Sequence, residues 1–346
     1  MRKFIAVLPL VALVAACNSG GNGSANKAGA QLKIVGSSTV YPFTTAVSEE
    51  FQRANPGSSA IVESTGTGAG IKLFCGGVGD QFPDAVNASR PIKASEYADC
   101  AKNGAKNVIE FPIGIDGLTL IQAKGQPALT LTTTDIYKAL AANPFGKPNT
   151  AKTWKDVNPS LPATKIRVLG PPPTSGTRDS LADLILAKGC ESDPAMKELK
   201  KTDEKKHKDI CTKVREDGAY VEAGENDNLL VQKVSADPGS LGVLGFSFLE
   251  ENADKVAAVS LGGVQPTETT ISDLSYPGSR KLYLYFKGEH MAAKPGIKQF
   301  IAAYAKLIGK GGLLEKRGLV PFGGADLTAA TAQAAALTPL DPASLK

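Results

Sequence analysis

Hydroxyl-bearing side chains gather at three places where a strand-like run gives way to a helix-like run. The turns are GSSTVYPF (36–43), STGTGAG (64–70) and PPPTSGTRDSL (171–181). The start of a helix presents unpaired backbone N–H groups and the positive end of the helix dipole, and Ser and Thr add O–H donors. Helix starts of this kind bind anions. A single Ser or Thr there is also an ordinary cap, but the repetition predicts one oxyanion site built from several helix N-termini.

Two arginines adjoin these hydroxyl groups. Arg90 follows Ser89 in the segment NASRPI (87–92), and Arg178 falls in the first turn of the helix after Thr177. A guanidinium offers an oxyanion two parallel, charge-assisted hydrogen bonds. We therefore expect Arg90 and Arg178 to clamp the anion. The alternative for each is a structural ion pair.

The elements that position these turns alternate along the chain. Apolar runs predict strands, and apolar residues three to four apart predict helices. Such alternation is typical of an α/β protein with a mainly parallel sheet, in which ligands bind at the carboxyl ends of the strands. The extended stretches 113–121 and 280–286 are expected to cross between two domains. The other predicted strands are 32–35, 60–63, 108–111, 166–169 and 241–246, and the predicted helices include 44–53, 71–74, 92–103, 134–142, 178–186, 229–234 and 295–308.

The N-terminus has the pattern of an export signal. Basic residues precede an apolar run over 4–14, which is too short to span a bilayer as a mature helix. Small residues directly before Cys17 resemble a bacterial lipobox, so residues 1–16 are expected to be a lipoprotein signal peptide and Cys17 the lipidated residue. The alternative is that Cys17 merely lies near a conventional cleavage site. Residues 17–30 are rich in Gly, Asn and Ser, which suits a flexible tether.

Four further cysteines remain, an even number in a chain expected to be exported. Exported proteins meet an oxidising environment, which favours disulfides. Local pairing, Cys75–Cys100 and Cys190–Cys211, is the simplest of three connectivities. No C-x-x-C spacing occurs and the two histidines, His207 and His290, are far apart, so we expect no metal site.

Length and charge set broad limits on the function. The 346 residues suit two domains, and no second long apolar stretch follows the first. Without Arg2 and Lys3, the 39 basic residues become 37 against 34 acidic ones, a net charge near +3. This mild bias gives no reason to expect nucleic acid as a partner, and we expect a monomer.

The ordered set of motifs resembles the phosphate-binding protein family, PstS, of ABC phosphate importers. The segment AGENDNL (223–229) completes that set, and the resemblance covers nearly the whole mature chain, closest to an arginine-containing branch. It implies a type II periplasmic-binding fold, an α/β fold with two mixed-sheet lobes joined by two crossover strands that closes on its ligand. The implied bounds are 31–112 and 282–335 for lobe one, 113–281 for lobe two and 336–346 for a loose tail.

The resemblance also implies a function and a ligand set. The chain would be a lipid-anchored receptor on the periplasmic side of the envelope that captures inorganic phosphate and delivers it to a membrane permease. It would need no cofactor and would not be an enzyme. The implied phosphate-binding residues are Ser38, Thr39, Thr67, Ser175, Gly176 and Thr177, to which Ser89, Arg90 and Arg178 are added.

Two departures from the family bear on selectivity. Much of the family has an acidic residue where this chain has Arg90, and an arginine near the position of Pro171. A carboxylate accepts the proton that phosphate carries and sulfate lacks. Asp116, Glu222 and Asp227 are the candidates for this role, although each also suits a cap of a turn or helix.

Other functions therefore stay open at this point. One is the same fold with sulfate, molybdate, arsenate or a phosphonate as its ligand. A phosphatase-like enzyme is less favoured, because it would need an activating base or metals. The sequence shows no Ser–His spacing and no dense Asp/His cluster.

Overall fold

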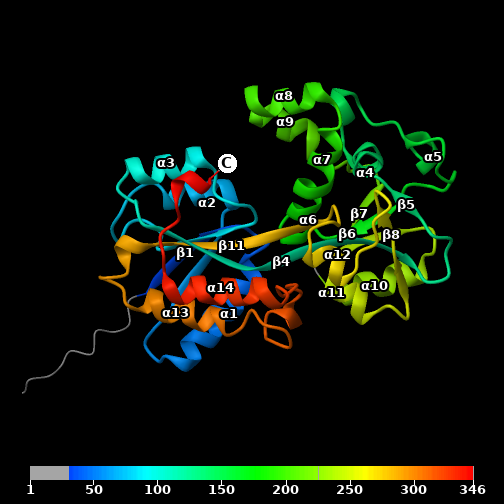
Figure 1. Cartoon of the computed structure of the whole chain (residues 1–346). Coiled ribbons are helices and arrows are strands. Elements are labelled where there is room, and N and C mark those ends of the chain that lie inside the picture. Colours follow the sequence, from blue (N-terminus) through cyan, green and yellow to red (C-terminus); the bar gives the residue numbers. More distant parts are fainter. Residues whose placement is uncertain (1–30, 225, 346) are drawn as a thin grey trace, which may run out of the picture.

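The computed structural model describes residues 31–224 and 226–345. The expected signal peptide 1–16, the lipidation site Cys17 and the tether 17–30 lie outside the described residues. Figure 1 shows two α/β lobes that share two long strands, β4 (Val108–Ala123) and β11 (Ser279–Lys287). Within the described part of the chain, no helix has the length and apolar character needed to cross a membrane.

The first lobe is built on three parallel strands. These are β1 (Leu32–Gly36), β2 (Ala60–Ser64) and β3 (Ala85–Ala88), in the order β2-β1-β3, and β11 then pairs antiparallel with β3. Helices cover both faces of this sheet (Figure 1). One layer contains α1 (Tyr41–Ala54), α13 (Gly296–Ala305) and α14 (Gly324–Ala336), and the other contains α2 (Thr67–Phe74) and α3 (Ala94–Lys102).

Helix α1 forms because its apolar residues recur every four positions and so line one face. Phe43, Val47 and Phe51 are all buried, and the Phe51 ring meets Phe300 of α13 edge to face at 5.3 Å between ring centres. Pro42 stands in the first turn, where a missing N–H costs no helical hydrogen bond. This packing fixes the start of α1, and with it the hydroxyl turn, relative to the sheet.

The second lobe continues from the far half of β4. Its sheet contains β6 (Val168–Gly170), β7 (Tyr220–Glu222), β8 (Leu241–Gly245) and β9 (Val256–Ala258), and a separate pair is formed by β5 (Thr130–Leu131) and β10 (Ser260–Leu261). Strands β6, β7 and β8 are parallel to one another, while β8 and β9 are antiparallel to β4. The sheet is therefore mixed.

The helices of this lobe surround its sheet. They are α4 (Thr133–Leu140), α5 (Trp154–Val157), α6 (Gly176–Ser180), α7 (Ala187–Cys190), α8 (Pro194–Thr202), α9 (Glu204–Cys211), α10 (Asp227–Ala236), α11 (Phe246–Glu251) and α12 (Glu268–Ser272). A wider π-helical turn, η2 (Leu181–Leu186), links α6 to α7, and η1 (Pro144–Gly146) is a short 3-10 turn of this lobe. Three more 3-10 turns follow β11 in the chain, outside this lobe: η3 (Gly288–His290), η4 (Glu315–Arg317) and η5 (Pro342–Ser344).

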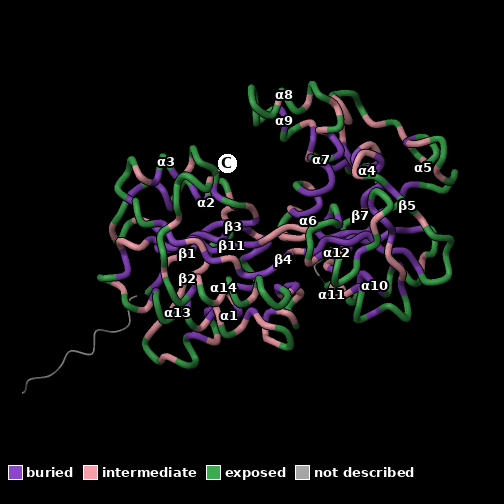
Figure 2. The backbone as a smooth tube through the Cα atoms, in the orientation of Figure 1, coloured by how far each residue is buried: buried purple, intermediate pink, exposed green. Residues whose placement is uncertain are grey.

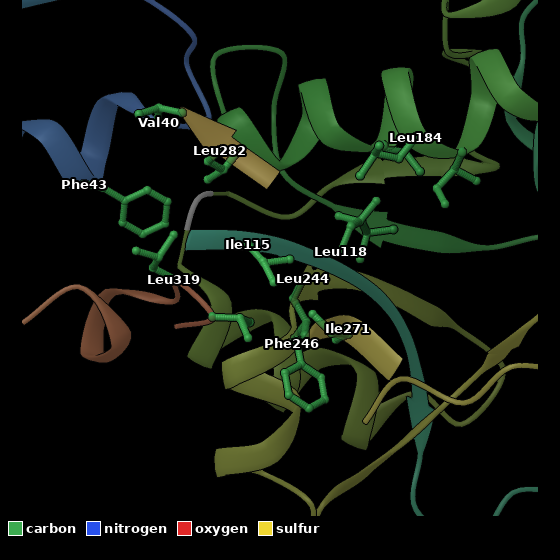
Figure 3. Packing of buried hydrophobic residues seen from close by; sticks show 14 of the residues in the cluster. Val40, Phe43, Ile115, Leu118, Leu184, Leu244, Phe246, Ile271, Leu282 and Leu319 are labelled. Carbon is green, nitrogen blue, oxygen red and sulfur yellow. The ribbon is translucent and has the colours of Figure 1, made fainter. Parts of the chain in front are cut away.

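The two crossover strands confirm the predicted fold class. Strand β4 pairs with β11 over residues 108–117 and with β8 from Leu118 onward, so one strand leaves one lobe and enters the other. The separately predicted stretches 108–111 and 113–121 are thus a single strand. A continuous apolar cluster follows it, and Figure 3 shows Ile115 and Leu118 near Leu319 and Leu244. The backbone of these central strands is buried along most of its length (Figure 2).

Covalent links and the C-terminus complete the packing. The cysteines pair as Cys75–Cys100 and Cys190–Cys211. The tail is expected to be loosely packed over 336–346, but its described part, residues 336–345, packs on the first lobe. The Leu340 N–H donates to the Val108 carbonyl at 2.8 Å, and Leu340 and Leu345 pack on the apolar cluster of the first lobe. The few leucines in this Ala- and Pro-rich segment are enough to dock it.

Candidate functional site

The hydroxyl turns of the first lobe lie along one edge of its sheet. Strands β1, β2 and β3 are parallel, so the turns that follow them start at the same edge. The first turn is tight because Gly36 has a φ of +129°, and a Cβ there would lie 2.2 Å from the Asn87 carbonyl oxygen. The end of β1 is thereby held against the end of β3, and the segments after both strands are neighbours.

Thr67 and Ser89, two of the predicted phosphate-binding residues, lie next to each other. Their hydroxyl oxygens are 3.0 Å apart, and the Ser89 N–H donates to Thr67 Oγ1 at 3.1 Å. Thr67 begins α2, whose first backbone N–H groups have no acceptor within the helix. This pair of hydroxyls therefore stands at a helix start, the surroundings that favour an anion.

The SGT turn of the second lobe meets the first hydroxyl turn of the first lobe. Ser175 caps α6 by accepting from the Thr177 N–H at 3.2 Å. Thr39 Oγ1 donates to the Gly176 carbonyl at 3.1 Å, and Ser38 Oγ donates to the Asp179 carboxylate. The structure therefore brings these two turns together, with both hydroxyl protons of 38–39 directed to the opposite lobe.

Gly176 stands where the backbones of the two lobes come close together. A Cβ at this position would lie 2.5 Å from Thr39 Cα and 2.7 Å from the Ser38 carbonyl oxygen. Real Cβ atoms do not come this close to backbone. Glycine is therefore needed here for close packing of two backbones, a reason that the sequence alone does not reveal.

Arg90 forms the ion pair named as its alternative. Its Nη1 and Nη2 donate to the two carboxylate oxygens of Glu96 at 2.9 and 2.8 Å. This hydrogen-bonded carboxylate raises the pKa of Arg90 above its usual value, and Asp183 of the second lobe adds to the effect. Glu96 also accepts from the Lys93 N–H at the start of α3. In this conformation an anion would have to compete with Glu96 for Arg90.

Arg178 contacts an aromatic ring and a backbone carbonyl. Its guanidinium lies 4.2 Å from the centre of the Tyr220 ring, and Nη1 donates to the Pro171 carbonyl at 3.3 Å. Tyr220 donates to the same carbonyl at 2.7 Å. Among residues 31–224 and 226–345, no carboxylate lies within ion-pair distance of Arg178. The ring and the carbonyl orient the guanidinium without neutralising it.

Arg280 is a site residue that the sequence reasoning missed. It lies on β11 opposite Asp116 on β4, and its Nε donates to the Asp116 carboxylate at 3.1 Å. The Nη2 group donates to Thr39 Oγ1 at 3.0 Å and to Ser180 Oγ at 2.8 Å. The sequence placed Arg280 in a crossover strand, but nothing in the spacing shows that positions 116 and 280 face each other.

The three predicted proton acceptors have different surroundings. Asp116 already accepts from Arg280 and, at 2.7 Å, from Ser180 Oγ. Glu222 is exposed at the end of β7. Burial raises the pKa of Asp227 to about 6, and no hydrogen bond to its carboxylate is found among the described residues. None of the three accepts a hydrogen bond from Ser38, Thr39, Thr67 or Ser89 in the described structure, whereas Asp179 accepts one from Ser38.

Metal-binding groups are not assembled in the described ranges. No group of three or more His, Cys, Asp or Glu side chains there could hold a metal ion. His290 Nδ1 is hydrogen-bonded to Asp84 at 2.7 Å, and His207 Nε2 lies 3.6 Å from Glu191. Both histidines are buried in separate lobes, so they belong to local packing.

Known proteins share this architecture. A family model described as a PBP superfamily domain matches residues 22–304. Protein SphX of Synechococcus elongatus is 33% identical over 340 residues, covering 96% of this chain and 88% of its own length. Phosphate-binding protein PstS of Staphylococcus saprophyticus is 31% identical over 294 residues, covering 84% and 80%. The crystal structure of a possible phosphate binding protein from Planctomyces limnophilus matches with a TM-score of 0.71 at 28% identity, covering 89% of this chain and 99% of that one.

Two α/β lobes, two crossover strands and polar turns that meet between the lobes define a solute-binding protein of the type II periplasmic class. The chain belongs to the family of solute-binding proteins that includes SphX and PstS.

Proposed function

We propose that this protein captures inorganic phosphate between its lobes and delivers it to the permease of an ABC importer. The observation that carries the proposal is that helix starts with hydroxyl groups come from both lobes and that Arg178, next to Thr177, has no ion-pair partner among residues 31–224 and 226–345. The relatives named phosphate-binding proteins support the same ligand.

The proposed binding mode follows from the donors available. Backbone N–H groups at the starts of α1, α2 and α6 supply partial positive charge, and the hydroxyls of Thr67 and Ser89 supply short O–H donors. Arg178 would supply the full charge that offsets the cost of drawing a multiply charged anion out of water. Ser38, Thr39, Ser175, Gly176 and Thr177 would frame the anion from the two lobes, and Arg90 would join if the anion displaces Glu96.

Capture and delivery would use the hinge formed by β4 and β11. An anion that touches both lobes stabilises the conformation in which they are close, so binding shifts the population toward that state. Lobe bounds of 31–112 plus 282–335 and 113–281 are part of this proposal. So are lipid anchoring through Cys17, a location on the periplasmic side of the membrane, and a monomer that acts by binding rather than catalysis.

Isothermal titration calorimetry on protein stripped of anion tests the function. Phosphate and then sulfate would be titrated at pH 6 and pH 8, using wild type, Arg178→Gln and the matched surface variant Arg167→Gln. Arg167 pairs with Asp237 at 2.8 Å just before β6, at the opposite end of that strand from the site. Loss of a charge-assisted bond predicts about 10- to 100-fold weaker phosphate binding for Arg178→Gln. The Arg167 variant should match wild type.

The same titration decides between phosphate and a wider set of oxyanions. One observation favours a receptor for several oxyanions: the Asp116 carboxylate, a candidate acceptor for the proton of phosphate, already accepts hydrogen bonds from Arg280 and Ser180. Phosphate binding without sulfate heat would support a phosphate receptor. Equal affinity for both ions would mean that the site reads charge alone, and the function would become that of a general oxyanion receptor. Absence of phosphate heat from wild type would reject the proposed function.

A further inference from the structure

Arg280 joins three parts of the molecule with one side chain. Its base is on the crossover strand β11, where it pairs with Asp116 of the other crossover strand. Its Nη2 reaches Thr39 at the start of α1 in the first lobe. The guanidinium also contacts the second lobe, through Ser180 at 2.8 Å and through Asp183 at 3.2 Å.

The surroundings make this contact a rigid one. The Arg280 side chain is only 10% exposed, and all three guanidinium nitrogens have acceptors. A planar guanidinium holds its N–H groups in a fixed fork, so several acceptors are positioned relative to one another. Thr39 Oγ1 accepts a hydrogen bond from Arg280 and donates one to the Gly176 carbonyl. One continuous chain of hydrogen bonds thus runs from the crossover strands to both helix starts.

Two carboxylates neutralise Arg280, so it is a poor source of charge for binding an anion. Asp116 contacts it directly and Asp183 adds a second carboxylate, so the guanidinium is already neutralised. It therefore differs from Arg178, which forms no ion pair within the described part of the chain. An anion gains little from a cation held in this way, whereas the geometry of the two turns depends on it.

We propose that Arg280 is a positioning residue that docks the start of α1 against the start of α6 and so couples the crossover strands to the anion site. The contacts that make up this docking are all between groups of the protein itself. Its link to phosphate rests on the function proposed above. Without the Arg280 guanidinium the two turns can separate. Part of the binding free energy of the anion is then used to bring the turns together, so the affinity falls.

Distance measurements between the lobes test the docking directly. Nitroxide labels on Asp99→Cys in α3 and Lys205→Cys in α9, two exposed positions on different lobes, would report the separation by pulsed electron resonance (Figure 1). Cys17→Ser in the full chain leaves the labels as the only free thiols, since the other four cysteines are in disulfides. Arg280→Gln and Arg280→Lys are compared with wild type and with Arg167→Gln, all without anion.

If Arg280 docks the two turns, the distances between the two labels should be longer and more broadly distributed in Arg280→Gln than in wild type. A lysine keeps the charge but not the fork, so Arg280→Lys should resemble Arg280→Gln rather than wild type. Thr39→Val keeps the shape and removes the acceptor, and it should shift the distances in the same direction. Phosphate affinity should fall about 5- to 150-fold in these variants, a typical range for coupling between sites. The Arg167 variant should leave both quantities unchanged.

The outcomes separate this proposal from the function. Wild-type and Arg280→Gln distances that coincide without anion, in protein with a cooperative unfolding transition, would overturn the positioning role whatever the affinities are. If Arg280→Gln does not fold, Thr39→Val carries the same test. If the label distances are longer in Arg280→Gln but wild type does not bind phosphate, the positioning role of Arg280 would be supported and the proposed phosphate function would be rejected.

Discussion

Gly176→Ala is the sharpest perturbation of the contact between the lobes. The added Cβ would lie 2.5 Å from Thr39 Cα, and ordinary van der Waals contact begins at 3.4 Å. The two helix starts must therefore move apart by about 0.9 Å, because the atom that is met is backbone and cannot rotate away. The Thr39–Gly176 hydrogen bond of 3.1 Å and the Arg280–Thr39 bond of 3.0 Å would lengthen with it.

We expect Gly176→Ala to weaken phosphate binding more than it lowers the free energy of unfolding. Overpacking of this size costs about 1–3 kcal/mol. Alanine is meanwhile about 0.5–1 kcal/mol better than glycine within a helix, which offsets part of the loss in global stability. Phosphate binding receives no such compensation, since it needs both turns in place. We expect about 5- to 150-fold weaker binding, the same energy expressed as a ratio.

Calorimetry with phosphate measures the effect, and Gly324→Ala is the control. Gly324 is also the first residue of a helix, α14, but a Cβ there meets nothing within 4 Å. Wild-type affinity is expected for Gly324→Ala. Wild-type affinity for Gly176→Ala would refute the reasoning, because it would mean that the bound state does not use the close approach of Thr39 and Gly176.

Two further predictions concern stability. Burial raises the pKa of Asp227 to about 6, above the ordinary value of 3.8, so stability should rise as the pH falls from about 7 toward 4. Asp227→Asn should remove that rise and stabilise the fold at pH 7.5 by at most about 3 kcal/mol in urea unfolding; a difference from wild type that is constant with pH would contradict this. Cys190 and Cys211 are fully buried and close a loop of 21 residues, so replacing both by Ser should cost about 2–4 kcal/mol, and equal unfolding midpoints would contradict it.

The local order of elements could be predicted because it depends on near neighbours. Apolar spacing placed the helix that became α1, with Phe43, Val47 and Phe51 on its buried face. It also placed the strand that became β8. The hydroxyl turns could be found for the same reason, since a strand that ends in glycine and a helix that starts with Ser or Thr leave a signal within about ten residues.

The partners of charged side chains could not be predicted. Arg90 and Arg178 look alike in the sequence, each beside a hydroxyl residue, yet Arg90 is held by Glu96 while Arg178 lies over Tyr220. Asp116 appeared free to accept a proton until β4 and β11 paired in a register that sets Arg280 opposite it. Arg280 and Asp116 are 164 positions apart in the sequence, and no local pattern shows that they pair. The register of β4 and β11 is fixed by the packing of whole lobes.

The sequence by itself determined several of the helices and strands, the chemistry of the hydroxyl turns and the family, although it did not reveal strands such as β3 and β7. Each of these is encoded by residues that are close together in the chain. Only the tertiary structure decided which donors remain free for an anion and which are used to hold the lobes. That choice depends on distances between the ends of α1, α6 and β11, and these distances exist only after the two crossover strands have paired.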